Sequence, residues 1–526
     1  MQSELITIKE ASEWISIQYK KNVTPSNISY LVNYGRITKF GENGTTLVSR
    51  EEVVKYYDSY YGNRQLNWKE KLGDDIDWHL SFEQYKEAET TKHVHRLHPY
   101  KGKFIPQLVE YFLDSHTDEF KKEVYFKRGD IVLDPFCGSG TTLVQANELG
   151  INALGVDISV FNALMSNVKV GKYDLLELNR ELKKITELLR EFIVDSSTVK
   201  FEQRLLEELS KFNNDFFPSP EFKVMVKNGD VDENRYGREK EIEFLPIFKK
   251  LVNEYGIELK QEVIEGFLDK WFLKHVRAEI DFVFSQIKKI KSPNTKKVAT
   301  IILSRTIRSC RATTHSDLAT LLEPVTTTYY CSKHGKICKP LFSILSWWER
   351  YSKDTVKRIA EFSSLRSATY QHCFTADGRI IDLFYETERA NSDFAKQLKK
   401  QKIAGIFSSP PYVGLIDYHE QHAYAYDLFG LKRKDELEIG PLSKGQGKEA
   451  KESYVNGIVD VLNNCKKFLA DDYNVLLVAN DKYNLYPTIA EKAGMRIVQQ
   501  YKRPVLNRTE KDKGAYSESI FHLKGK

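Results

Sequence analysis

A glycine-rich stretch, Asp134–Thr142, has residue types suited to binding a charged ligand. It reads Asp-Pro-Phe-Cys-Gly-Ser-Gly-Thr-Thr and follows the apolar run Ile131–Leu133. Gly138 and Gly140 let the backbone turn sharply and approach a ligand without an intervening Cβ. The predicted helix after the turn offers free N–H groups and a positive dipole end, which suit a carboxylate as well as a phosphate. The stretch lacks the Gly-Lys-Ser/Thr of a P-loop and the G-x-G-x-x-G of a dinucleotide site, which argues against both.

An acidic residue ends the next predicted strand. Asp157 follows the apolar run Ala153–Val156, and an acid at this position is placed to bind both hydroxyls of a ribose. By itself, Asp157 could equally serve as a helix N-cap. Together with the glycine-rich turn, it predicts a pocket for a nucleoside that carries a charged, amino-acid-like tail.

A second stretch with chemical potential, Ser409-Pro410-Pro411-Tyr412, follows the predicted strand 403–407. Its two prolines fix φ and remove two donors, which leaves rigid, outward-pointing carbonyls. The Ser409 hydroxyl and the Pro410 carbonyl can accept hydrogen bonds from an exocyclic amine, and Tyr412 can stack on a base flipped out of a duplex. These groups could hold and polarise an amine without a metal or a covalent nucleophile.

Both stretches resemble motifs of the DNA amino-methyltransferases that use S-adenosylmethionine. The glycine-rich turn followed by Gly-Val-Asp157-Ile-Ser is similar to their cofactor motifs, and Ser-Pro-Pro-Tyr is similar to their catalytic motif. The resemblance implies that the turn binds the methionine part of the cofactor and that Asp157 binds the ribose. It implies as catalytic residues Ser409, Pro410, Pro411 and Tyr412. It implies as cofactor-binding residues Lys103, Phe104, Asp134, Pro135, Phe136, Gly138, Ser139, Gly140, Thr141, Asp157, Ile158 and Asp377.

Three of these cofactor residues come from weaker matches. The segment His98–Gln107 resembles the family's segment that closes over the methionine end, which would place Lys103 and Phe104 near the carboxylate. The segment Phe374–Arg379 resembles the one whose acid contacts the adenine amino group, which would be the role of Asp377. The alternatives are a surface lysine, a core phenylalanine and a turn residue.

The target base follows from the first residue of the catalytic motif. In this family, serine there is typical of N4-cytosine enzymes and aspartate of N6-adenine enzymes. Ser409 therefore implies site-specific methyl transfer to N4 of cytosine in duplex DNA by base flipping, in a restriction–modification system. The alternatives are an N6-adenine DNA methyltransferase, an RNA amine methyltransferase and a non-catalytic DNA-binding regulator. A cytosine-C5 enzyme would need a Pro-Cys pair, and this sequence has none.

The elements that must position these motifs predict an α/β fold. Short apolar strands alternate with helices before residue 170 and again after residue 371, which indicates a Rossmann-like methyltransferase sheet split by a large helical insertion. The predicted domains are a winged helix-turn-helix (1–60), a linker (61–92), the cofactor-binding half (93–170), the helical insertion for target recognition (171–370) and the catalytic half (371–526).

The N-terminal residues predict a helix, a turn, a second helix, a β-wing about Gly41–Gly44 and a third helix. This order resembles the winged helix-turn-helix of excisionase-type and MerR-type DNA-binding domains. In such a domain, Asn27 and Tyr30 on the second helix would enter the major groove, while the wing would touch the DNA backbone. The same fold also serves as a packing or protein-interaction module.

The insertion contains two clusters with possible functions. Arg305, Arg308 and Arg311 recur at helix-like spacing and could line one face for phosphates or bases; an ion-paired or solvated face is the alternative. Cys331, His334 and Cys338 lie close together in sequence, with His315, His372 or Cys373 as a possible fourth ligand. Because the chain has neither a C-x₂-C pair there nor a second pair, the sequence favours no metal site.

The composition limits the class of protein. The chain has 526 residues, 41% of them hydrophobic, and a net charge of +6, which permits a double-stranded DNA partner but does not show one. Its 6 cysteines exclude a disulfide scaffold. No apolar run is long enough for a membrane span. We expect a cytoplasmic, prokaryotic, nucleoid-associated protein with a possible cognate restriction endonuclease; the sequence does not predict the oligomeric state.

Overall fold

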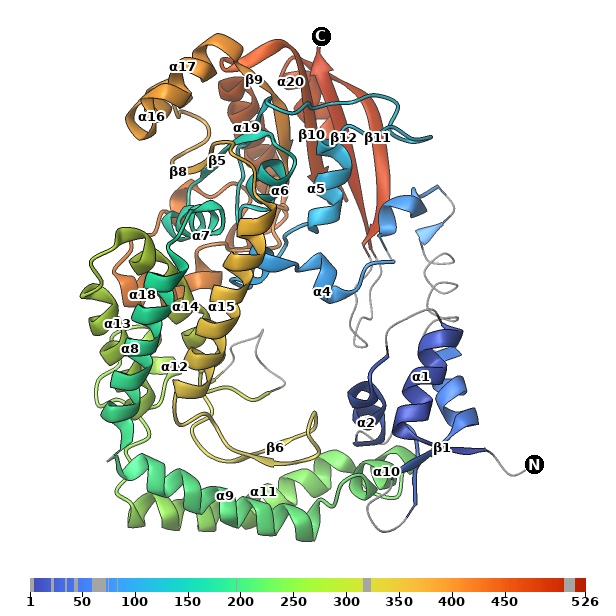
Figure 1. The fold of residues 1–526 in the computed structure, drawn as a ribbon, viewed down its shortest axis with the longest axis vertical. Helices are drawn as coiled ribbons and strands as arrows, with labels where there is room; N and C mark the ends of the chain where they lie inside the picture. The colour runs from blue at the N-terminus through green and yellow to red at the C-terminus, as the bar shows by residue number, and fades with distance from the viewer. Residues whose placement is uncertain are drawn as a thin grey trace. The chain divides into compact units, whose positions relative to one another are not determined.

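The computed structural model of the chain (Figure 1) describes residues 4–19, 23–33, 36–41, 46–58, 72–73, 75–82, 84–194, 196–315, 323–505 and 516–526. The chain forms two compact units. The first unit comprises Met1–Lys71, Arg190–Glu279 and Ser309–Ile344, and the second comprises Leu72–Leu189, Ile280–Arg308 and Leu345–Lys526. No helix within the described ranges is long and apolar enough to span a membrane.

The second unit is built on a seven-stranded sheet with the order β11-β12-β10-β9-β4-β5-β8. The strands from β10 to β8 run parallel, and β12 runs antiparallel to both of its neighbours. The sheet is thus mostly parallel, and the predicted α/β class is confirmed. The strands are β4 (Ile131–Asp134), β5 (Asn152–Asp157), β8 (Gln371–Thr375), β9 (Ile403–Ser408), β10 (Leu469–Ala479), β11 (Met495–Val505) and β12 (Tyr516–Gly525).

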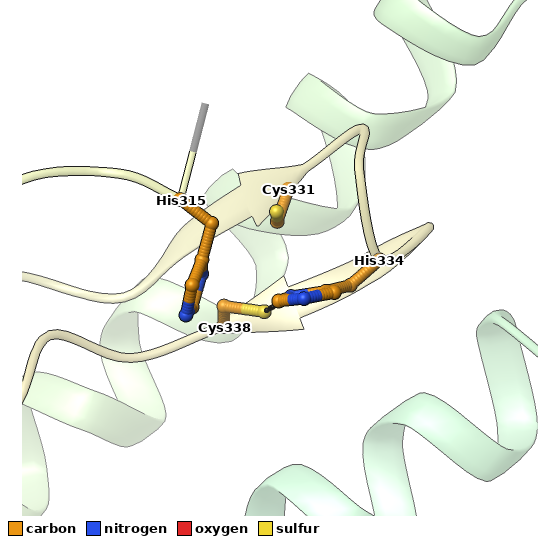
Figure 2. A group of neighbouring side chains, drawn as sticks. All are labelled: His315, Cys331, His334 and Cys338. Carbon is orange, nitrogen blue, oxygen red and sulfur yellow. Dashed lines mark hydrogen bonds between the residues drawn. The ribbon is translucent and has the colours of Figure 1, made fainter. Parts of the chain in front are cut away.

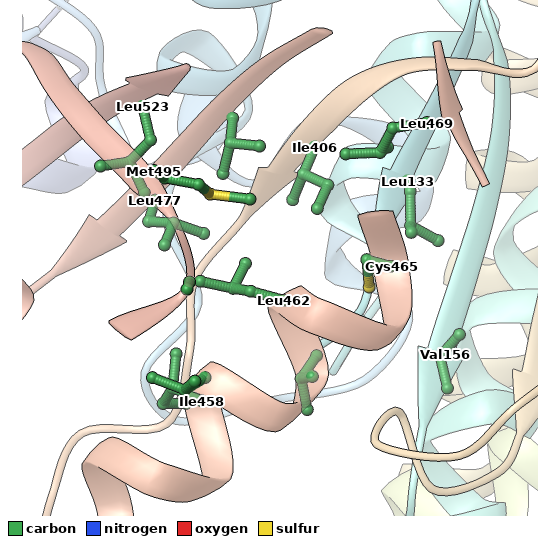
Figure 3. Close-up of a cluster of buried hydrophobic side chains, with 14 of the residues drawn as sticks. Leu133, Val156, Ile406, Ile458, Leu462, Cys465, Leu469, Leu477, Met495 and Leu523 are labelled. Carbon is green, nitrogen blue, oxygen red and sulfur yellow. The ribbon is translucent and has the colours of Figure 1, made fainter. Parts of the chain in front are cut away.

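One face of this sheet is covered by α19 (Lys448–Lys466), as Figure 3 shows. The apolar residues of α19 recur every three or four positions, so that Ile458, Leu462 and Cys465 fall on one side of the helix. They join a buried cluster with Leu133 of β4 and Ile406 of β9. The same cluster includes side chains from α16 (Leu383–Ala390), α17 (Ser392–Gln401) and α20 (Tyr486–Lys492).

The opposite face is covered by helices from the cofactor-binding half. Side chains alternate between faces along a strand, so Phe407 points away from the cluster that contains its neighbour Ile406. Phe407 meets Phe112 of α5 (Pro106–Leu113), with ring centroids 5.9 Å apart. Next to α5 lies α6 (Thr141–Glu148), and next to α6 lies α7 (Val160–Val170). The sheet is thus covered by helices on both faces.

The chain reverses its direction across the sheet between β4 and β9. From β4 it continues through β5 to β8 on one side, whereas from β9 it continues to β10 on the other. In open parallel sheets, ligands bind in the crevice at the carboxyl ends of the strands at such a reversal. The glycine-rich turn follows β4, and the Ser409–Tyr412 motif follows β9. Both motifs therefore lie at the reversal point.

The predicted insertion is helical, but its helices divide between the two units. Most of α14 (Pro293–Ser309) and all of α15 (Leu345–Leu365) belong to the second unit. There, Ser304 Oγ lies 3.1 Å from His98 Nε2, and Arg358 Nη1 donates to the His93 carbonyl at 3.2 Å. These helices therefore support the segment that leads to Lys103. The remaining helices of the insertion are α8 (Leu175–Val194), α9 (Ser197–Phe216), α10 (Glu221–Asn228), α11 (Glu233–Glu254), α12 (Phe267–Trp271) and α13 (Lys274–Lys288).

The N-terminal residues of the first unit contain the predicted helices and short strands. Helix α1 (Ile8–Gln18) begins with a capping box between Thr7 and Glu10, and α2 (Pro25–Asn33) follows. Apolar side chains of both helices share a small buried core. Strands β1 (Leu5–Thr7), β3 (Leu47–Ser49) and β2 (Lys39–Phe40) form a sheet in that order, and residues 50–58 are helical. The predicted wing turn at Gly41–Gly44 falls mostly outside the described residues.

Part of the predicted linker, residues 61–92, is packed structure. Residues 59–71 lie outside the described part, but the backbone N–H of Asp77 donates to the Lys502 carbonyl at 2.7 Å. The Lys502 N–H returns a bond to Asp77 Oδ2 at 2.7 Å. This segment therefore pairs with the edge strand β11 and covers its open hydrogen-bonding groups. The segment also holds the short helices η1 (Trp78–Ser81) and α4 (Glu87–Thr90), and η2 (His93–Arg96) follows it.

Candidate active site

A cavity that is partly open to solvent lies in the second unit where the chain reverses between β4 and β9. Its walls are formed by residues within the segments 100–104, 135–141, 157–162, 376–378, 409–411 and 437–439, together with Tyr418 and Val461. Of the predicted cofactor residues, it is lined by Lys103, Phe104, Pro135, Phe136, Gly138, Ser139, Thr141, Asp157, Ile158 and Asp377. Of the predicted catalytic residues, it is lined by Ser409 and Pro411. One cavity thus joins two motifs that are more than 260 residues apart in the chain.

The glycine-rich turn has little room for side chains. Gly138 has a φ of +50°, and a Cβ at this position would lie 3.0 Å from the hydroxyl of Tyr100. Gly140 has a φ of +75°, and its Cβ would lie 2.8 Å from Ser166 Oγ of α7. Glycine is required at both positions because the left-handed φ and the close neighbours exclude a side chain. Gly138 exposes backbone to the cavity, whereas Gly140 packs α6 against α7.

Asp157 links the tip of β5 to this turn. Its Oδ2 accepts the Gly138 N–H at 2.7 Å, and its Oδ1 accepts the Ser159 N–H at 2.8 Å. Burial raises the pKa of Asp157 to about 7, although both N–H groups act in the opposite direction. Oδ1 also accepts from Asn162 Nδ2 at 3.2 Å, so Oδ2 is the oxygen that keeps a lone pair for a further donor. The carboxylate is therefore oriented in advance by its own backbone.

A cationic end of the cavity is formed by Lys103. Its ammonium donates to the His95 carbonyl at 2.9 Å, and no described carboxylate forms an ion pair with it. Burial and nearby Arg96 lower the pKa of Lys103 to about 8. Beneath the turn, the buried Lys169 donates to the Ser139 carbonyl at 2.6 Å. A buried cation without an anionic partner is costly, so this end fits the carboxylate of an amino-acid-like ligand.

Asp377 lies on another wall, on the loop after β8. Arg379 holds its carboxylate through two bonds, Nε to Oδ1 at 2.9 Å and Nη2 to Oδ2 at 2.7 Å. This ion pair lowers the pKa of Asp377 against the opposing effect of burial. The acid is therefore charged and fixed in direction. The cavity therefore has a cation, Lys103, and an anion, Asp377, with apolar side chains between them. This arrangement fits a zwitterionic nucleoside.

Several predicted site residues do not line the cavity. Asp134 is buried, and its Oδ1 accepts the Ser408 hydroxyl at 2.5 Å. This bond ties the end of β4 to the end of β9, so Asp134 aligns the two motifs and does not face the cavity. Pro410 is buried as well. Gly140 and Tyr412 also lie outside the lining.

Tyr412 is held by the antiparallel part of the sheet. Its hydroxyl donates to Glu518 Oε1 of β12 at 2.6 Å. Glu518 Oε2 lies 3.5 Å from Nε of Arg503 on β11, and both of these side chains are buried. Burial together with the negative Glu518 raises the pKa of Tyr412 well above its usual value. Tyr412 is therefore a neutral ring with a fixed orientation beside the Ser409–Pro411 wall.

The predicted arginine face is wrong for Arg305. This side chain is buried, pairs with Asp354 Oδ2 at 2.7 Å and lies over the ring of Tyr351 at 4.0 Å. Arg311 is buried too, beyond the end of α14, which stops at Ser309. Arg308 is half-buried. The helical spacing indicated one exposed face. Instead, Arg305 packs against α15, because its aliphatic stem is apolar and Asp354 neutralises its guanidinium charge.

The two residues predicted to read DNA lie on α2. Tyr30 is 45% exposed. Asn27 is exposed, but its Oδ1 accepts from the N–H and the hydroxyl of Thr24 at 2.8 and 2.9 Å. The carbonyl end of Asn27 therefore caps its own helix. The Asn27 side-chain NH₂ takes no part in this cap.

Sequence reasoning missed several residues of the site. Tyr100 and Tyr418 line the cavity and stack with centroids 6.1 Å apart. Both lie next to the quoted motifs, so proximity in sequence was an available signal. Glu438 lines the cavity and accepts the His419 N–H at 2.8 Å, and Lys169 and Glu518 act behind it. No local pattern marks these three, because only the fold brings them to the site.

The comparisons with known proteins agree with this geometry. The family model described as DNA methylase matches residues 7–164. The type II methyltransferase M.MjaII of Methanocaldococcus jannaschii is 46% identical over 525 residues, which cover 99% of this chain and 97% of that protein. M.MvaI of Kocuria varians is 28% identical over 135 residues, 26% of this chain and 28% of that protein. The chain therefore belongs to the type II DNA amino-methyltransferases, whose methyl donor is S-adenosylmethionine.

Proposed function

We propose that this enzyme methylates N4 of cytosine at a specific site in duplex DNA. The observation that carries the proposal is that Ser409 and Pro411 line the same cavity as Gly138 and Asp157. These residues lie at the carboxyl ends of the neighbouring strands β9, β4 and β5. A methyl donor held on one wall can therefore face an amine held on the other, which supplies the proximity that a bimolecular displacement needs.

The residues of the turn and its neighbours bind the methyl donor. S-adenosylmethionine supplies, when bound, a methyl group activated by its positively charged sulfur. Lys103 pairs with the carboxylate of its methionine part, and Asp157 accepts hydrogen bonds from its ribose. Asp377, fixed by Arg379, accepts a hydrogen bond from the adenine amino group. Apolar side chains, such as Phe136 and Ile158, exclude water from the adenine.

The residues at the end of β9 hold the target amine. Ser409 Oγ and the Pro410 carbonyl each accept a hydrogen bond from one N–H of the amine. These bonds favour a lone pair localised on the nitrogen rather than delocalised into the base ring. Tyr412 stacks on the flipped base, and Glu518 fixes the ring that does so. The amine then becomes the nucleophile without first losing a proton, which leaves to solvent after the methyl group is transferred.

Cytosine is favoured because the first residue of the motif is Ser409. Its neutral hydroxyl has the acceptor that cytosine needs, and the family's adenine enzymes typically have aspartate there. Adenine N6 is the main alternative. Incubating the purified protein with S-adenosylmethionine and mixed-sequence duplex DNA, followed by nucleoside mass spectrometry, tests the choice. N4-methyldeoxycytidine is expected, and N6-methyldeoxyadenosine would contradict the cytosine proposal.

The N-terminal residues 4–58 contribute DNA binding as a winged helix-turn-helix. They have their own small core, and α2 exposes Tyr30 on its surface. Together with a cognate restriction endonuclease, the enzyme would form a prokaryotic restriction–modification system that acts at the nucleoid. Competition between duplex DNA and RNA separates this proposal from RNA methylation. Failure to bind S-adenosylmethionine would favour a non-catalytic regulator.

A further inference from the structure

Four potential metal ligands come together in the first unit, remote in sequence from both catalytic motifs. Figure 2 shows His315, Cys331, His334 and Cys338 turned toward one another. One ligand atom from each lies within 4.8 Å of all the others. His334 Nδ1 and Cys338 Sγ are 3.4 Å apart. In a tetrahedral zinc site, ligand atoms lie roughly 3.3–3.8 Å from each other, given metal–ligand distances of about 2.0–2.3 Å.

Three of the ligands are placed by one hairpin. Cys331 ends β6 (Tyr329–Cys331), His334 lies in the turn, and Cys338 ends β7 (Lys336–Cys338). The turn is tight because the N–H groups of His334 and Gly335 both donate to the Cys331 carbonyl, at 3.0 and 2.7 Å. Gly335 adopts a φ of +63°, which favours glycine. The turn thus folds His334 back over the two cysteines.

The fourth ligand is His315, and a neighbour orients its ring. The Tyr329 hydroxyl lies 2.7 Å from His315 Nδ1 and accepts the backbone N–H of His315 at 3.2 Å. With its Nδ1–H donated to this oxygen, His315 presents the Nε2 lone pair. Metal-ligating histidines are commonly held in this way by a partner on the other nitrogen. The other sequence candidates, His372 and Cys373, lie on β8 of the second unit instead.

The hairpin has a small apolar core of its own. Its buried cluster consists of Tyr329, Cys331 and Cys338, with Val325 partly buried against it. Ile337 of β7 is also buried, and the ring of Tyr330 lies 5.4 Å from that of Phe217. Further ties to α9 and α11 are polar. Asn213 exchanges two hydrogen bonds with the backbone of Ile337, at 2.9 and 3.0 Å, and Glu241 accepts the Tyr330 N–H at 2.9 Å. Small elements with such a core usually need a metal or a disulfide.

We propose that His315, Cys331, His334 and Cys338 bind a structural zinc ion. Two thiolates and two imidazoles in a tetrahedral set select zinc among the common divalent ions. All four positions would be filled by protein, so the ion has no open site for catalysis. Its role is to fasten residue 315 to the hairpin within the first unit. None of the four residues lines the cofactor cavity, so this site is independent of the catalytic one.

The chief rival is a disulfide between Cys331 and Cys338. Metal analysis of the full-length protein, purified without chelators, separates the two. The zinc proposal expects about one zinc ion per chain and free thiols at both cysteines. An unreduced protein that shows the Cys331–Cys338 disulfide by mass spectrometry and lacks zinc would overturn it.

Matched variants assign the ion to these residues. Cys331→Ser with Cys338→Ser should lose the zinc, whereas Cys310→Ala should keep it, because Cys310 is a buried cysteine of the same unit outside the cluster. His334→Cys should also retain zinc, since it replaces one zinc ligand by another. Cobalt added to metal-free wild type should give the visible absorption of tetrahedral thiolate coordination. Zinc loss in Cys310→Ala, or the absence of that spectrum, would contradict the assignment.

Discussion

The cavity and the Cys/His cluster reach an ordered geometry by different means. The cavity lies at the tips of strands whose side chains belong to a large buried core under α19, so the scaffold exists before any ligand binds. The cluster lies on a two-stranded hairpin with few buried apolar residues, namely Tyr329, Cys331, Ile337 and Cys338. The difference suggests that the first site uses its ligand for chemistry, while the second uses its ligand for structure.

The largest expected effect is on methyl transfer at the end of β9. Replacing both Ser409 and Tyr412 by alanine removes an acceptor for the target amine and the stacking ring. We expect methyl transfer to duplex DNA to fall by about 10²–10⁴-fold. Transfer of a labelled methyl group measures this loss. Calorimetric binding of S-adenosylmethionine should stay within about twofold, because the cofactor walls remain. Retained methyl transfer would contradict the proposal that Ser409 and Tyr412 hold the target base.

A smaller effect is expected from Lys103. Lys103→Met removes the cation proposed to pair with the cofactor carboxylate, and a charged hydrogen bond of about 1.5–3 kcal/mol corresponds to roughly 10–150-fold in affinity. The pKa of Lys103 is lowered to about 8 in the free protein. Affinity in the wild type should therefore fall as the pH rises through 8, because the ammonium loses its charge. Titration calorimetry across this range is the measurement, and Lys103→Arg should flatten the profile. Unchanged affinity in Lys103→Met would remove Lys103 from the cofactor site.

Chelation sharpens the comparison between the two sites. If zinc orders the hairpin, a strong chelator should increase proteolysis of residues 309–344 by about tenfold. The affinity for S-adenosylmethionine should not change, because the cavity has its own core. Limited proteolysis with mass spectrometry locates the cuts. Equal protection with and without chelator would mean that the contacts with the neighbouring helices suffice.

The last prediction concerns the pH dependence of the free energy of unfolding, to which Asp157 contributes. Burial raises the pKa of this carboxyl to about 7, above the unfolded value of 3.8. The folded state then binds the proton more tightly than the unfolded state, so this contribution to stability is lost as the pH rises through about 7. Asp157→Asn should lack this loss, gaining about 2–3 kcal/mol on wild type between pH 5 and pH 8. Denaturant unfolding at both pH values checks it, and parallel pH profiles would contradict it.

The sequence was most informative where a motif and a strand end coincide. Gly138, Asp157 and Ser409 lie within short local patterns, so their joint position followed from the rule that binding sites form at the carboxyl ends of parallel strands. The α/β class followed for the same reason. By contrast, the sequence could not show that Asp134 would bond Ser408, because that contact depends on the pairing of β4 with β9.

The sequence was least informative in the insertion. The spacing of Arg305 and Arg308 is the same for a DNA-binding face as for a buried one, and only the position of Asp354 decides between them. Likewise, His315 is 16 positions before Cys331, and no zinc-binding spacing links the two. Its place in the cluster depends on the Tyr329 contact, which is a property of the folded hairpin.

The central claim is that one cavity brings the methyl donor and the target amine together. The most direct test is a crystal structure of the enzyme with S-adenosylhomocysteine and a target duplex. The account predicts the carboxylate of this ligand at Lys103, its ribose at Asp157, and a flipped base between Ser409 and Tyr412 with its amino group facing the ligand sulfur. A flipped base bound away from Ser409–Pro411, or a ligand outside this cavity, would contradict it.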